Sequence, residues 1–85
     1  MAKYCKKPVV IEAFQWDGSK EQEGFPKWFL KAKEEGIVYF KNDVLVIKTL
    51  EGDHIAREGE FIIQGVKGEL YPCKEDIFHM TYMEV

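Results

Sequence analysis

Apolar and aromatic residues near the start of the chain predict a β-strand over residues 8–16 (PVVIEAFQW). Val9 and Ile11 fall on one face of this strand, and Val10 and Phe14 fall on the other. β-branched and aromatic residues favour strands, and apolar side chains on both faces indicate a strand that is covered on both sides. The polar run that follows it predicts a loop.

Apolar residues at helical spacing then predict one amphipathic helix over about residues 26–35. They recur every three or four positions, at Phe25, Trp28, Phe29 and Ala32. Pro26 suits the first turn of a helix and Gly36 suits the position just beyond its end.

The remaining sequence predicts a meander of short strands separated by turns. Residues 37–40 and 44–50 flank Lys41-Asn42-Asp43, which predicts a hairpin loop. Glycine-containing turns follow at 51–53, 57–60 and 66–68, so the strands between them are short and depend on one another for stability.

For the end of the chain, the sequence predicts a helical turn followed by a strand. Residues 73–79 (CKEDIFH) favour one turn of helix, with Glu75 and Asp76 near its positive end. The alternation over residues 80–84 predicts a last strand.

Length and composition fit one globular domain over residues 1–85. The 85 residues are enough for one core and too few for two, and 46% of them are hydrophobic. We therefore predict an α+β fold, with a small antiparallel β-meander sheet packed against one amphipathic helix. No segment has the roughly 20 apolar residues of a membrane span, and the start lacks a signal region, so we expect a cytoplasmic protein without a membrane partner.

The charge pattern changes the expected partners. Twelve basic and fifteen acidic residues give a net charge of −3, which argues against nucleic acid as a partner. Residues 1–50 carry +2 and residues 51–85 carry −5. This asymmetry, together with the open edges of short strands, predicts a homodimer or small homo-oligomer in which the basic opening of one copy faces the acidic half of another.

Catalytic and metal-binding motifs are not apparent in the sequence. His54 and His79 have no second ligand at metal-binding spacing, and we expect no metal and no cofactor. Cys5 and Cys73 read as thiols rather than a disulfide. A position at the start of a helical turn would lower the pKa of Cys73, so a small hydrolase using Cys73 or His54 stays as an alternative.

Aromatic residues give the strongest sign of a binding surface. Twelve of them in 85 residues exceed what a small core requires, so we expect some rings to be exposed beside basic side chains. Such an arrangement stacks a base, holds a phosphate or anchors a protein interface. The candidate contact residues are Lys6, Lys7, Trp16, Arg57, Tyr71 and Lys74.

Two long motifs resemble a family of small phage and prophage proteins. They are the opening residues 3–16 (KYCKKPVVIEAFQW) and the closing residues 65–78 (GVKGELYPCKEDIF), with TLEG at 49–52 between them. The chain departs from the family pattern at Cys5, where an arginine is expected, and at residues 58–61, where EGEF replaces a Pro-Gly-Asp-Tyr turn.

The resemblance implies an accessory phage protein in the cytosol of a bacterial host. Such proteins commonly act by stoichiometric binding, so it implies a non-enzymatic counter-defence role, in which the protein blocks a host protein or sequesters a small nucleotide-like signal. An enzyme and a nucleic-acid-binding phage protein remain the alternatives.

Overall fold

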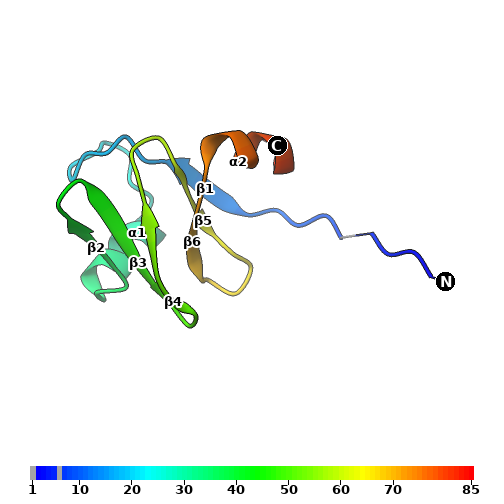
Figure 1. Cartoon of the computed structure of the whole chain (residues 1–85), viewed down its shortest axis with the longest axis horizontal. Helices are drawn as coiled ribbons and strands as arrows, with labels where there is room; N and C mark the ends of the chain where they lie inside the picture. The colour runs from blue at the N-terminus through cyan, green and yellow to red at the C-terminus, as the bar shows by residue number, and fades with distance from the viewer. Residues whose placement is uncertain (1, 6) are drawn as a thin grey trace.

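A computed structural model describes residues 2–5 and 7–85 and confirms the α+β class (Figure 1). Its strands and helices alternate irregularly along the chain. In chain order they are β1 (Glu12–Gln15), α1 (Lys27–Glu34), β2 (Val38–Lys41), β3 (Val44–Thr49), β4 (Gly52–Ala56), β5 (Phe61–Gln64), β6 (Leu70–Cys73) and α2 (Glu75–Thr81).

The strands form two antiparallel sheets of three strands each. One is the expected meander, with the order β2-β3-β4, and the other has the order β1-β5-β6. The pairing of β2 with β3 confirms the predicted hairpin. Lys41, which was expected in the loop, belongs to β2 and pairs with Val44, so the turn consists of Asn42 and Asp43 alone. Asn42 has a φ of 54°, a left-handed conformation that asparagine tolerates better than most residues.

The two sheets and α1 share a core. Along each strand every second side chain faces it, as the pleat requires. The sheet β1-β5-β6 contributes Phe14, Ile62 and Leu70, and the sheet β2-β3-β4 contributes Val38, Leu45, Ile47 and Ala56. Phe29 and Ala32 of α1 complete this core together with Trp16, so the amphipathic helix buries the face that its spacing predicts.

The opposite face of the sheet β1-β5-β6 lies under α2. The rings of Phe61 and Phe78 stack with centroids 3.9 Å apart and planes 4° apart. A second contact joins α2 to β1, where the Gln15 side-chain amide donates to the Glu75 carboxylate. Since α2 has only seven residues, these contacts rather than its own turns hold it in place.

The first predicted strand is shorter than its sequence indicates. Its pairing with β5 ends where Glu12 lies opposite Gln64, because β5 then turns away through Gly65. Residues 7–11 therefore continue as a chain with no strand beside it among the described residues, and Figure 1 shows this stretch leading away from both sheets.

The strand predicted over residues 80–84 is wrong. The chain stays helical to Thr81, whose hydroxyl donates to the Ile77 carbonyl 2.9 Å away. Phe78 and Tyr82 are four residues apart and their rings lie 5.0 Å from each other, a helical spacing that outweighs the short alternation.

Candidate binding groove

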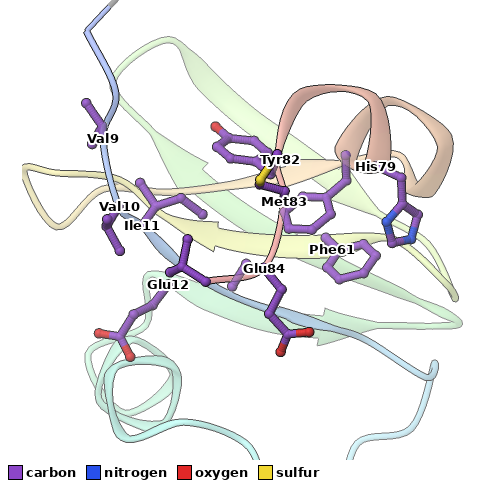
Figure 2. Close-up of a pocket in the computed structure, with 12 residues that line it drawn as sticks. Val9, Val10, Ile11, Glu12, Phe61, His79, Tyr82, Met83 and Glu84 are labelled. Carbon is purple, nitrogen blue, oxygen red and sulfur yellow. The ribbon is translucent and has the colours of Figure 1, made fainter.

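An apolar groove lies between the segments at the two ends of the chain. Two adjoining cavities of about 580 and 740 Å³ form it, and we call them together the terminal groove. Figure 2 shows the side chains that line the smaller cavity. Both cavities are lined by Val9, Val10, Ile11, Tyr82, Met83 and Val85.

The fold produces this groove where two elements end. The ladder between β1 and β5 stops at Glu12, so the preceding residues form one wall without being part of a sheet. Helix α2 stops at Thr81, and residues 82–85 form the other wall. The stacked Phe61 and Phe78 fix α2, and with it the position of the second wall.

Three apolar side chains of these walls are far more exposed than ordinary packing would leave them. Val10 is 77% exposed, Met83 86% and Val85 96%. Tyr4, further out on the N-terminal segment, is 94% exposed. Apolar surface concentrated in one place on a small protein marks an interaction site.

The charged residues of the groove are mostly acidic. Glu12 and Glu84 line the smaller cavity, and Glu69 and Lys7 line the larger one. Three carboxylates against one ammonium group make the groove favourable for a basic ligand and unfavourable for a phosphate.

Tyr71 and Tyr82 form a hydroxyl pair in the larger cavity. Burial, a hydrogen bond with the Tyr82 side chain and the nearby Glu69 carboxylate together raise the pKa of Tyr71 from 10.0 to about 12. Tyr71 is therefore a neutral hydrogen-bonding group at physiological pH.

This raised pKa predicts an alkaline loss of stability. The folded protein holds the Tyr71 proton up to about pH 12, whereas the unfolded chain releases it near pH 10.0. The contribution of the protonated Tyr71 to the free energy of unfolding is complete below pH 10.0 and is lost as the pH rises toward 12. Thermal melts across this window should show a steeper decline for the parent than for Tyr71→Phe, and equal slopes would contradict the assignment.

The structure brings together two of the six predicted contact residues. Lys7 and Tyr71 both line the larger cavity. Arg57 and Lys74 are exposed but line neither cavity. Lys6 lies outside the described residues.

Trp16, the remaining predicted contact residue, does not belong to a binding surface. Its side chain is only 1% exposed and its indole Nε1 donates to the Ser19 carbonyl 2.8 Å away. A ring enclosed in the core has no free face for a ligand to stack on, so Trp16 serves the fold.

Cys73 does not have the lowered pKa expected of a nucleophilic cysteine. Burial, Asp76 and Glu60 raise the pKa of its thiol, although the start of α2 lies two residues away. A raised pKa lowers the thiolate fraction on which nucleophilic attack depends.

The two histidines lie on different elements. His54 is an exposed residue of β4, and His79 packs on α2 against the edges of Phe61 and Phe78. The described residues contain no group of three metal-ligating side chains.

Sequence reasoning missed most of the groove. The local pattern predicts a strand covered on both faces at Val9 and Val10, and another strand at Met83. The available signal was the excess of apolar residues at both ends of the chain, but only the three-dimensional structure places the two ends at one groove.

No protein-family model, curated protein or solved structure matches this chain. Within residues 2–5 and 7–85, no helix is long and apolar enough to cross a bilayer.

Proposed function

We propose that the protein acts by stoichiometric binding rather than catalysis, and that the terminal groove receives an extended segment of a partner protein. The observation that carries this proposal is the apolar wall of the groove, where Val10, Met83 and Val85 are more than three-quarters exposed. A partner that covers these side chains removes apolar surface from water, which stabilises the complex by about 25 cal/mol for each Å² buried.

The charge of the groove specifies the partner further. Glu12, Glu69 and Glu84 favour a segment in which basic residues accompany apolar ones. The same carboxylates oppose a phosphate, so we favour a protein partner over a nucleotide-like signal. In the phage context implied by the opening and closing motifs, this partner is a host defence protein in the bacterial cytosol.

A titration with synthetic peptides tests the proposal. The probes are two seven-residue peptides, one alternating valine with lysine and the other valine with glutamate. Calorimetry should show one-to-one binding of the lysine peptide only. Val10→Ser and Met83→Ser should each weaken this binding by about tenfold or more, because each removes apolar surface from the wall without changing the charge of the groove.

Two controls separate the groove from its surroundings. Leu50→Ser changes a fully exposed apolar residue in the turn between β3 and β4, away from the groove, and should leave binding intact. Cys73→Ser should also bind normally, since the proposal assigns its thiol no chemical role. Equal affinity for both peptides, or no binding at all, would overturn the proposal, and binding of ATP in their place would favour the nucleotide alternative.

A further inference from the structure

We propose that strand β4 pairs with β4 of a second copy, antiparallel and centred on Ile55, so that the sheets β2-β3-β4 of two chains join into one sheet. This pairing does not involve the terminal groove and therefore stands apart from the proposed function. It assigns an interaction surface to a sheet edge whose residues are complementary to themselves.

The outer side of β4 carries backbone groups without partners. β4 is the last strand of its sheet, so only its other side lies beside a strand of that sheet, β3. Gly52 pairs with Thr49 across a two-residue turn, so Gly52 and every second residue after it bond to β3. The backbone groups of Asp53 and Ile55 therefore point to the open side, where no described residue bonds to them. Such an edge can accept another strand.

The side chains along this edge form a symmetric charge pattern. Asp53, Ile55 and Arg57 are alternate residues, so they lie on the face of the sheet opposite to the core residue Ala56. All three are exposed, and Ile55 keeps 47% of its surface in solvent. Neither charged side chain has an ion-pair or hydrogen-bond partner in the described part of the chain. Opposite charges on either side of an apolar residue complement a second, antiparallel copy of themselves.

Pairing centred on Ile55 satisfies this pattern. Ile55 of each copy exchanges both backbone hydrogen bonds with Ile55 of the other. On each side of the axis, Asp53 lies opposite Arg57 of the second copy, which brings opposite charges together twice. The Arg57 N–H donates to the Asp53 carbonyl, while the Arg57 carbonyl keeps the Glu60 N–H that it already accepts at 3.0 Å.

Other registers are disfavoured by charge. A pair centred on Asp53 places two carboxylates opposite each other, and a pair centred on Arg57 places two guanidinium groups opposite each other. A pair centred on His54 sets the apolar Ile55 against Asp53. The sequence therefore selects one register of the edge, as a two-fold contact requires.

The joined sheet also continues an apolar row. Tyr39, Val46 and Ile55 lie side by side across the three strands, on the face away from the core. Ile55 of the second copy comes next in this row and covers the half-exposed Ile55 of the first. The row adds side-chain contact to the backbone hydrogen bonds of the strand pair.

A short strand pair makes a reversible dimer. Its contact is smaller than the roughly 1,200–2,000 Å² of a standard interface, so we expect dimerisation at about 10–100 μM. None of Asp53, Ile55 and Arg57 lines the terminal groove, so the dimer carries two open grooves. It can therefore bind two linked partner segments at once, which a monomer cannot.

A charge-reversal experiment tests the pairing. Sedimentation equilibrium across micromolar to millimolar concentrations should find a monomer–dimer equilibrium for the parent. Arg57→Asp and Asp53→Arg should each weaken dimerisation by about tenfold or more, because each places like charges opposite one another. An equimolar mixture of the two variants should restore a heterodimer, since the like charges of one variant then face the opposite charges of the other.

Matched controls reverse charges at the far edge of the same sheet. Lys41→Asp in β2 and Asp43→Arg in the following turn change exposed residues and should dimerise like the parent. Thermal melts check that each variant folds. Because Asp53 lies opposite Lys48 within its own chain, Asp53→Asn is the milder substitution, and it should also weaken dimerisation.

Amide hydrogen exchange reports the register directly. The Ile55 amide, which has no acceptor in the single chain, should exchange more slowly at concentrations where the dimer forms. The His54 amide bonds to β3 and should change little. A parent that stays monomeric, a dimer that the reversals leave unchanged, or a dimer with a fast-exchanging Ile55 amide would overturn the pairing. Each of these results leaves the groove proposal standing, since peptide binding does not depend on dimerisation.

Discussion

Phe29→Ala should destabilise the protein by about 3–5 kcal/mol, the usual cost of removing a buried phenylalanine. The Phe29 side chain is fully buried, and its ring centroid lies 5.0 Å from that of Phe14 and 4.7 Å from that of Phe25. The free energy of unfolding of small proteins is about 5–15 kcal/mol, so this substitution removes a large part of it. Chemical denaturation monitored by circular dichroism measures the change.

Leu30→Ala is the matched control for this prediction. Leu30 is the next residue on α1 but is 47% exposed, so its truncation should cost much less. Similar midpoints for the two variants would show that α1 does not bury the face seen in the structure.

Trp16→Ala should have a comparable effect, again about 3–5 kcal/mol, although Trp16 has the residue type of a ligand-stacking side chain. The substitution leaves a cavity in the core and removes the donor to the Ser19 carbonyl. Any loss of partner binding in this variant should therefore be explained by the fraction of unfolded protein, which denaturation of the same sample measures.

A pair of milder substitutions separates the hydrogen bond from the ring. Trp16→Phe keeps an aromatic ring but leaves the Ser19 carbonyl without its donor, and should cost about 1–3 kcal/mol. Trp28→Phe removes an indole N–H that is buried without a hydrogen-bond partner in the described structure, so it should cost less. A larger loss at Trp28 would contradict this difference.

Local patterns in the sequence were sufficient for the elements that depend on neighbouring residues. The spacing of Phe29 and Ala32 predicted α1, and the Asn42-Asp43 turn lies within the predicted hairpin loop. Helical periodicity and hairpin turns are set by residues close in sequence, and therefore can be read from it.

The division into two sheets depends on contacts between distant residues. β1 pairs with β5, which joins Phe14 to Ile62 across most of the chain, and no local pattern specifies that choice. The same pairing sets where β1 begins, because an extended segment with strand propensity becomes a strand only beside a partner.

The candidate site was predictable only in part, for a related reason. Lys7 and Tyr71 were recognised by residue type and do line the groove. Trp16 was misassigned because an indole suits a core and a binding surface equally well. Met83 and Val85 were missed, since apolar residues are assigned to the core unless the fold is known to leave them outside.

Helix α2 is attached to the sheet β1-β5-β6 by a few contacts, chiefly the stacked rings of Phe61 and Phe78 and the hydrogen bond from Gln15 to Glu75, and this gives the molecule two levels of stability. The core between the sheets involves neither Phe61 nor Phe78, so α2 can detach while the core remains folded. Such local unfolding would carry residues 82–85 away and dismantle the terminal groove without denaturing the protein. Susceptibility to proteases near the C-terminal helix, rather than the melting temperature, would then govern how long the protein stays competent to bind.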